Sequence, residues 1–159
     1  MKFNVKVILS WFLVFVVMFM IFGFSGETGE KSEETSKGVI VEVLDIVMEK
    51  EEITPEVVKK FQFPVRKLAH VGEYMLLGFC LINALKETTN KKVLFNGLIS
   101  VAIALVYAIT DELHQSFTGN RGPKFVDVLI DFSGSVIGVL IFIGFIYWYN
   151  KLIKRSRTV

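Results

Sequence analysis

Two histidines and several carboxylates stand inside long apolar stretches of this chain, where charged side chains are costly. His70 and Glu73 are three residues apart, as are Asp111 and His114. Residues at this spacing share one face of a helix, so each pair predicts a polar patch. An imidazole beside a carboxylate can act as a general acid or base, or help to hold a metal ion. Because an ionisable residue at the bilayer centre costs about 2.5–3.5 kcal/mol on insertion scales, these pairs are the first candidates for function.

Further polar residues extend the two patches and add a third. Arg66 and Lys67 precede His70, and Asp127 and Asp131 are four residues apart at the start of the last apolar stretch. Three helices would then each present a polar stripe at the same end. The candidates for acid–base chemistry or a polar site are His70, Glu73, Asp111, Glu112 and His114. The candidates for ligand binding are Arg66, Lys67, Gln115, Arg121, Asp127 and Asp131.

Each candidate also has an ordinary structural role. Arg66 and Lys67 would suit anchors that reach to lipid headgroups. An aspartate in the first turn of a helix, such as Asp127, is stabilised by the helix dipole. A single histidine at a helix end is usually structural. The coincidence of three polar stripes on one side of the membrane nevertheless favours a functional site over three unrelated structural features.

Four apolar stretches must position these residues, and each is long enough to cross a bilayer. They run from about Val5 to Phe24, Val65 to Leu85, Val93 to Leu113 and Val128 to Tyr149. A spanning helix needs about 20 apolar residues, and helices leave no backbone group unpaired in lipid. An apolar content of 52% and a mean hydropathy of +0.52 are consistent with membrane-spanning helices. The predicted fold is an all-α integral membrane four-helix bundle.

The segment between the first and second spans is predicted to carry short amphipathic surface helices. Ser25–Gly38 is polar and acidic and is interpreted as a flexible linker. From Val39 onward apolar residues recur at helical spacing between acidic ones, and Thr54 followed by Pro55 is typical of a second helix start. These helices, within 39–62, would lie on the outer surface or form a lid that binds a partner.

Domain boundaries follow from these elements. We expect a first transmembrane helix at 1–24, an extracytoplasmic connection at 25–64, a three-helix core at 65–150 and a basic cytoplasmic tail at 151–159. The first stretch resembles a signal peptide in its basic start, but its length exceeds the roughly 7–15 apolar residues of a secretory signal. We therefore expect it to be retained as an anchor.

Basic residues in the short segments predict the orientation. The N-terminus, the second connection and the tail are basic, whereas the first connection is strongly acidic. Cytoplasmic loops carry an excess of lysine and arginine, so both termini should be cytoplasmic and the polar site should face outward. The basic residues concerned are Lys2, Lys6, Lys86, Lys91, Lys92, Lys151, Lys154, Arg155 and Arg157.

Composition excludes some functions. Basic residues do not line a helix face with interleaved aromatics, so nucleic acid is not an expected partner. Cys80 is the single cysteine, which excludes an intramolecular disulfide. Small residues at four-residue spacing, such as Gly134 and Gly138, indicate close helix packing in lipid. Gly97, Ser100, Ala104 and Ala108 form the same pattern in the third span.

The polar motifs together resemble the VanZ-like family of bacterial membrane proteins. They are Arg66-Lys67-x-x-His70-x-x-Glu73-Tyr74, Tyr107-Ala108-x-x-Asp111-Glu112-x-His114-Gln115, and Arg121 followed by Asp127-Val128-x-x-Asp131, with Phe24-Ser25 ending the first span. The resemblance runs from about Phe24 to Gly138. It implies a four-helix protein of the bacterial cell membrane. The family's named member is associated with low-level resistance to teicoplanin, a lipid-bearing glycopeptide, but the family has no settled biochemical activity to carry over.

Three functions compete on this basis. The first is binding or protection at the outer leaflet, with an envelope lipid or a glycopeptide as partner beside the bilayer itself. The second is an intramembrane hydrolase or transferase. That enzyme would use a divalent metal as cofactor, held by His70, Glu73, Glu112 and His114, or a metal-free histidine base. The third is a small transporter.

Overall fold

The computed structural model describes residues 4–26, 29–47, 52–118 and 124–156, without the side chains of residues 29–33, 47 and 118. In order, the helices are α1 (Val5–Ser25), α2 (Gly29–Val47), α3 (Pro55–Thr88), α4 (Val93–Thr118) and α5 (Phe125–Ser156). Four of them, α1, α3, α4 and α5, are long and apolar enough to cross a membrane. The predicted all-helical membrane fold is confirmed.

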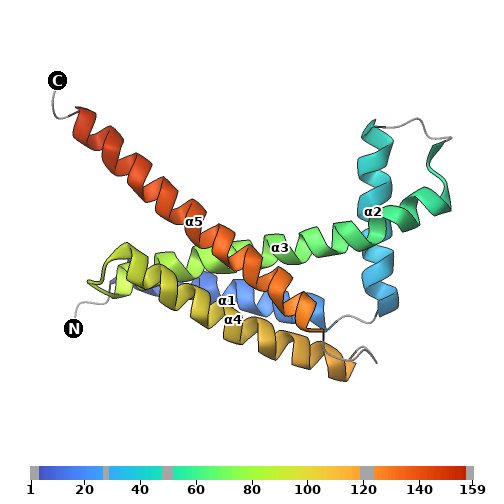
Figure 1. Cartoon of the computed structure of the whole chain (residues 1–159), viewed down its shortest axis with the longest axis horizontal. Helices are drawn as coiled ribbons and strands as arrows, with labels where there is room; N and C mark the ends of the chain where they lie inside the picture. Colours follow the sequence, from blue (N-terminus) through green and yellow to red (C-terminus); the bar gives the residue numbers. More distant parts are fainter. Residues whose placement is uncertain (1–3, 27–28, 48–51, 119–123, 157–159) are drawn as a thin grey trace.

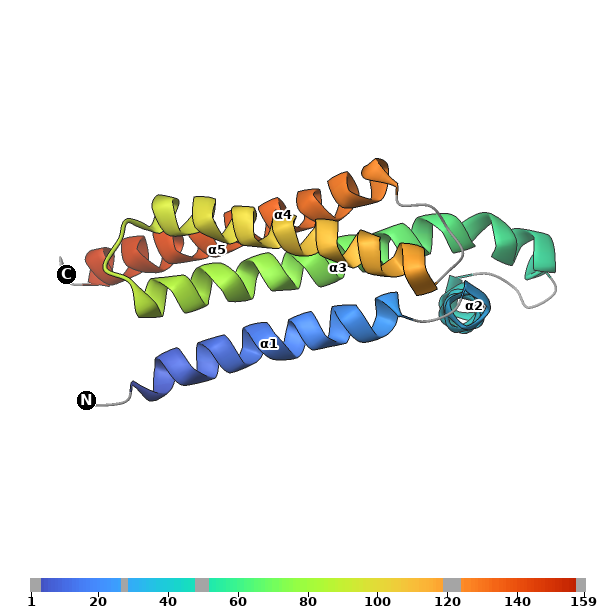
Figure 2. The same ribbon diagram turned by 90° about the horizontal axis from the view of Figure 1, so that it is seen from below.

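The bundle is arranged around α3, as Figures 1 and 2 show. Helices α1 and α4 lie along α3, while α5 crosses α3 obliquely and its C-terminal half diverges from the others. Helix α2 lies across one end of the bundle, nearly perpendicular to α1 and α3 in both views. We call the end near α2, where α1 and α4 end and α5 begins, the polar end, and the other the opposite end.

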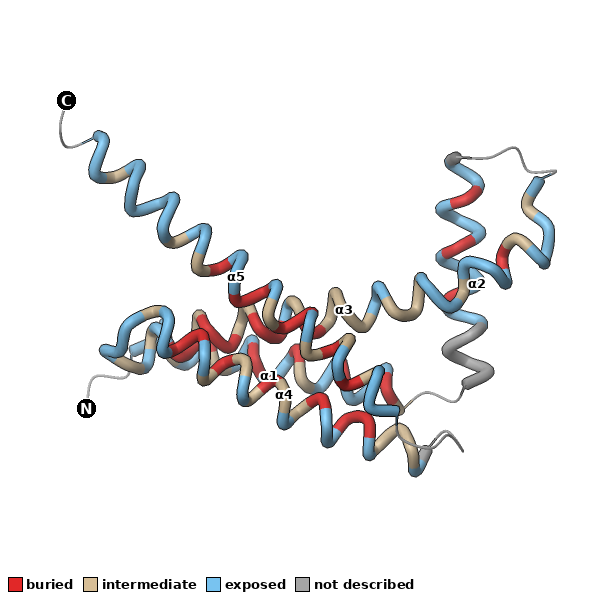
Figure 3. Tube along the Cα trace, viewed as in Figure 1, coloured by how far each residue is buried: buried red, intermediate tan, exposed pale blue. Residues whose placement is uncertain are grey.

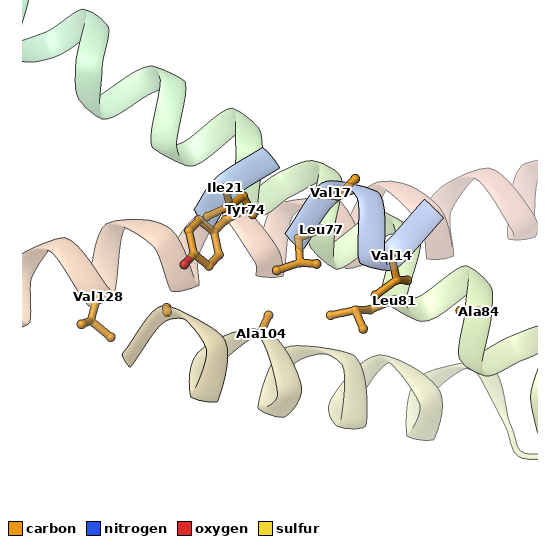
Figure 4. Close-up of a cluster of buried hydrophobic side chains, with 10 residues drawn as sticks. Val14, Val17, Ile21, Tyr74, Leu77, Leu81, Ala84, Ala104 and Val128 are labelled. Atoms are coloured by element: carbon orange, nitrogen blue, oxygen red, sulfur yellow. The ribbon is translucent and has the colours of Figure 1, made fainter. Parts of the chain in front are cut away.

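Buried residues concentrate where the four long helices meet, whereas the C-terminal end of α5 is largely exposed (Figure 3). Helix α4 contributes small residues here: Ser100, Ala104 and Ala108 are fully buried. Such residues let helix backbones approach closely, which drives packing in lipid. The main apolar cluster, partly drawn in Figure 4, comprises Val14, Val17, Ile21, Tyr74, Leu77, Leu81, Ala84, Ala104, Ala108 and Val128.

Glycines set the close crossing of α3 and α5. A Cβ atom on Gly134 would overlap the backbone of Val71, and one on Gly138 would overlap that of Met75. One turn away on α3, a Cβ atom on Gly78 would overlap the backbone of Ser135. Only hydrogen fits at these places, so the two backbones are in direct contact over more than a turn. The packing role predicted for the α5 glycines agrees with this geometry.

Helix α2 is longer than the sequence pattern predicts. It begins at Gly29, ten residues before the amphipathic stretch that opens at Val39. The stretch interpreted as a flexible linker is therefore largely helical. Glutamate is a good helix former, and this stretch of the sequence contains Glu30, Glu33 and Glu34.

The second predicted surface helix is the beginning of α3. Thr54 caps it by accepting a hydrogen bond from the Val57 amide at 3.4 Å, and the helix then continues through Pro64 for 34 residues. Its length is about 51 Å, well beyond the hydrocarbon thickness. A proline removes one helical hydrogen bond without ending the helix when packing supports both sides. Ile40 and Leu44 of α2 supply this packing on Val58.

Candidate functional site

Asp111 is the centre of a buried network that joins α1 to α4. Ser25 Oγ donates to Asp111 Oδ2 at 2.8 Å. The Gln115 amide donates to the same oxygen at 3.2 Å and to Ser25 Oγ at 3.1 Å. Asp111 is only 3% exposed. Ser25 was not among the predicted site residues, and its signal in the sequence was the Phe24-Ser25 motif at the end of the first span.

His70 lies between two carboxylates at the crossing of α3 and α5. Its Nδ1 atom is 3.9 Å from Glu73 Oε2 and 3.7 Å from Asp131 Oδ1. These distances are too long for hydrogen bonds but short enough for electrostatic interaction. Asp131 is buried, whereas His70 and Glu73 are half-buried. The predicted pair on α3 therefore gains a third member from α5.

An ion pair lies at the edge of the site, about one helical turn before His70 on α3. Lys67 Nζ contacts Asp127 Oδ1 at 2.5 Å, and the same ammonium lies 5.5 Å from the centre of the Phe63 ring. Asp127 is in the first turn of α5, where the helix dipole also favours a negative charge. The pair joins α3 to α5, and Arg66 lies half-buried beside it.

Glu112 fixes the start of α5. Its Oε1 atom accepts a hydrogen bond from the backbone amide of Lys124 at 2.6 Å, directly before the helix begins. The carboxylate is 6% exposed. A buried acceptor at this place orients α5 relative to α4, so Glu112 has a structural role in addition to any part in ligand binding.

His114 belongs to the seam between α1 and α4. Its ring stacks on Phe22, with ring centres 4.3 Å apart and planes inclined by 22°. A Cβ atom on Gly26 would lie 3.6 Å from its Nε2 atom. The neighbours of His114 thus come from α1, whereas those of His70 come from α3 and α5. Across the described residues, no three His, Cys, Asp or Glu side chains are grouped to hold a metal ion, and the divalent metal stays a prediction.

Tyr74 is a buried member of the site that the candidate residues omitted. Its side chain is fully buried, and its hydroxyl is within electrostatic range of Asp111 and Asp131. Figure 4 shows the hydroxyl directed toward the side of the core that Val128 occupies. A tyrosine in an apolar stretch is ordinarily core, and the signal for Tyr74 in the sequence was its place in the Glu73-Tyr74 motif. The nearby Tyr107 donates its hydroxyl to the Met18 carbonyl at 2.6 Å.

Buried polar atoms without a hydrogen-bond partner gather at the polar end. A buried donor or acceptor left unsatisfied costs about 1–3 kcal/mol, and native proteins contain few. Within the described part of the chain one such atom, Asn96 Nδ2, lies elsewhere. The others are His70 Nδ1, Glu73 Oε2, Tyr74 OH, Asp111 Oδ1 and Glu112 Oε2. They come from α3 and α4.

The structure therefore brings the predicted residues of α3, α4 and α5 to one end of the bundle. Arg121 lies outside the described residues. The model of the VanZ/LLP1 family matches residues 10–148, which include every candidate site residue. No curated protein and no solved structure matches the chain. With most of its length and all of its polar motifs inside the match, the chain belongs to the VanZ/LLP1 family.

Proposed function

We propose that this protein binds the headgroup of an envelope lipid at its polar end, which faces outward from the bacterial cell membrane. The observation that carries the proposal is the cluster of unsatisfied buried polar atoms at one end of membrane-spanning helices. A ligand that supplies hydrogen bonds to these atoms would recover the free energy that their burial costs. A lipid can reach such a site from the bilayer itself.

The distribution of basic residues supports the outward orientation. Helix α1 begins and α5 ends at the opposite end, and the α3–α4 connection lies there too. Cytoplasmic segments are enriched in lysine and arginine. The described basic residues of this end are Lys6, Lys86, Lys91, Lys92, Lys151, Lys154 and Arg155. Both termini would then be cytoplasmic.

The position of the charged groups along α3 supports a headgroup as ligand. Arg66 and Lys67 are six to seven residues from Glu73, which corresponds to about 9–10.5 Å along the helix axis. We call Arg66 and Lys67 the rim of the site, and cations at this position suit a lipid phosphate. Beside the rim, Phe63 and Leu68 expose most of their apolar surface, and such surface is compatible with lipid chains.

Lipid retention tests the proposal directly. The protein would be extracted in mild detergent with envelope lipids, and bound lipid would be measured by native mass spectrometry. We expect Glu73→Gln to lose the bound lipid. Glu87→Gln is the matched control, because the same change is made near the opposite end of α3. Equal retention by both variants and the parent would contradict the proposal.

Protection against teicoplanin is a consequence that we include in the proposal, because occupying an envelope lipid would alter what a lipid-bearing glycopeptide meets at the surface. A sensitive Gram-positive host expressing the parent should tolerate more teicoplanin than hosts expressing equally abundant Glu73→Gln or His114→Ala variants. Equal tolerance in all three would separate the polar end from resistance.

An enzyme is the second candidate, because His70 lies between two carboxylates. An imidazole placed in this way can serve as a general base for a hydrolase or transferase that acts on the bound lipid. Incubation of the purified protein with labelled envelope lipids should then give a new lipid product, which His70→Gln would not form. If the parent protein binds the lipid but leaves it chemically unchanged, the enzyme candidate is excluded and only the binding function remains.

A further inference from the structure

We infer that the headgroup bound at the polar end carries a primary ammonium group, which the buried carboxylates receive. This inference rests on the proposed function and names the ligand class of the same site. It does not follow from the basic rim, which would suit any lipid phosphate.

Negative charge is in excess inside the site. Among the described residues, no lysine or arginine forms an ion pair with these carboxylates. The imidazole of His70 lies near Glu73 and Asp131, while His114 acts on Asp111 and Lys67 acts on Asp131 electrostatically. The neutral donors are the hydroxyls of Ser25 and Tyr74, the Gln115 amide and the Lys124 backbone amide. The carboxylates are Glu73, Asp111, Glu112 and Asp131.

The carboxylates act on one another electrostatically. Asp131 of α5 is within electrostatic range of Asp111 and Glu112 of α4 and, with the opposite sign, of Lys67, and Glu73 of α3 is within range of Asp111. Like charges repel strongly where the surroundings are apolar. One positive charge placed among them would interact favourably with all four, whereas a phosphate or another anion would be repelled.

The pattern of unsatisfied atoms gives a second and independent indication. Tyr74 is fully buried, and its hydroxyl acts as a donor toward Asp111 without a hydrogen bond of good geometry, while Asp131 is also within electrostatic range. The free oxygens of Asp111 and Glu112 are buried in the same region. A primary ammonium brings three N–H donors and no acceptor. A quaternary ammonium has the charge but no N–H to donate.

The rim and the carboxylates are separated by a distance that a short headgroup spans. Asp127, which contacts Lys67, is four residues from Asp131, or about 6 Å along α5. A phosphate beside Arg66 and Lys67 therefore leaves an attached ammonium within about one helical turn of Asp131. The charge order, positive at the rim and negative inside, is complementary to a zwitterionic headgroup of this kind.

Three lipids with identical acyl chains distinguish the possible headgroups. Phosphatidylethanolamine has a primary ammonium, phosphatidylcholine a quaternary one, and phosphatidylglycerol only hydroxyls. The full chain would be mixed with each lipid in mild detergent, and the bound fraction read by native mass spectrometry. We expect phosphatidylethanolamine to be retained about tenfold better than either of the others, the effect of a charge-assisted hydrogen bond.

Variants test whether the preference for phosphatidylethanolamine depends on the carboxylates. Asp131→Asn and Asp111→Asn should reduce the preference to less than about twofold, while Glu87→Gln keeps it. Tyr74→Phe removes a single hydroxyl, so it provides a reading even if an aspartate variant fails to fold as a monodisperse protein. Loss of the preference in Tyr74→Phe supports the inference, and a preference kept in every folded variant overturns it.

The remaining outcomes separate the inference from the proposed function. Retention that depends on Glu73 but favours phosphatidylglycerol, or does not distinguish the three lipids, overturns the ammonium and leaves lipid binding in place. A bound mass that corresponds to a divalent metal instead of a lipid overturns the ammonium as well. No retention of any lipid by the parent overturns both.

Discussion

Asp111 links residues of two helices at the polar end. Through one carboxylate oxygen it holds Ser25 of α1 and Gln115 of its own helix, while its second oxygen is buried without a partner. A carboxylate that is half satisfied by fixed donors is held in place and still able to accept a further bond. This arrangement suits a binding group better than a purely structural one.

The Ser25 hydroxyl should contribute measurably to stability. We expect Ser25→Ala to lower the free energy of unfolding by about 1–3 kcal/mol, because a buried carboxylate loses a donor. Ser133→Ala is the control, since Ser133 is exposed and bonds only to the Ile130 carbonyl. Thermal unfolding followed with a thiol-reactive dye at Cys80, the half-buried single cysteine, would measure both. Equal melting temperatures would contradict the role of this bond.

At the scale of single residues, the sequence predicted charged groups better than neutral ones. His70 and Glu73 stood out because ionisable residues are costly in a span, and the structure places them together with Asp131. Ser25 and Tyr74 are common in apolar helices and become significant only when another helix brings a carboxylate to them. Such pairings between distant parts of the chain are not encoded in local spacing.

Among the helices, α3 and α5 form the tightest pair, and their glycines make this testable. Gly138→Ala should destabilise the protein by about 1–3 kcal/mol, because its Cβ atom would overlap the backbone of Met75. Gly144→Ala, six residues further on α5, meets nothing within 4 Å and should be neutral or slightly stabilising. The two melting temperatures give the comparison, and an equal loss would show that the crossing tolerates a methyl group.

Helix α2 has two apolar stripes with different neighbours. Ile40 and Leu44 pack on α3 at Val58. Val43 and Ile46 remain 54% and 84% exposed on the protein. Because α2 lies across the end of the bundle, the exposed stripe is placed to enter the membrane interface, as in helices that lie in the plane of the bilayer.

Lipid quenching tests this placement of α2. In a Cys80→Ser background, a fluorescent label on Ile46→Cys should be quenched by brominated lipids more strongly than the same label on Lys37→Cys. Lys37 is also exposed and, nine residues earlier, lies about half a turn around the same helix. Equal quenching at the two positions would place both faces of α2 in the same surroundings.

The sequence predicted the membrane-spanning helices well and the connection less well. Long apolar stretches determine a span almost by themselves, so α1, α3, α4 and α5 contain the four predicted spans. The extents of α2 and α3 depend on their packing against each other through Ile40, Leu44 and Val58. Residues that are far apart in sequence decide these boundaries, which local patterns cannot show.

On the scale of the whole molecule, α1 is tied to the bundle along its length. Near the opposite end, Trp11 donates to Thr88 at 2.9 Å and Asn83 donates to Ser10 at 3.2 Å. At the polar end, Ser25 reaches Asp111. The first span is therefore an integral part of the fold, and it also supplies one donor to the site.

Labelling of cysteines in intact cells tests the orientation of the whole molecule. In a Cys80→Ser background, Lys124→Cys at the polar end should react with a membrane-impermeant maleimide in intact cells. Lys91→Cys, in the α3–α4 connection, should react only after permeabilisation. Both lysines are exposed, so the comparison depends on their side of the membrane. The reverse pattern would place the polar end in the cytoplasm.

The divergence of α5 widens the group of long helices toward the opposite end. Beyond the glycine crossing, α5 still packs on α3 and α4 through Phe142, Ile143 and Ile146, and its C-terminal end then leaves the bundle (Figure 1). The exposed aromatic residues in this part of α5 include Phe145, Trp148 and Tyr149. A body that is wider at one end displaces more lipid from one leaflet than from the other. The protein would thus favour membrane of matching curvature, and crowding of lipids in one leaflet would press α5 toward α3.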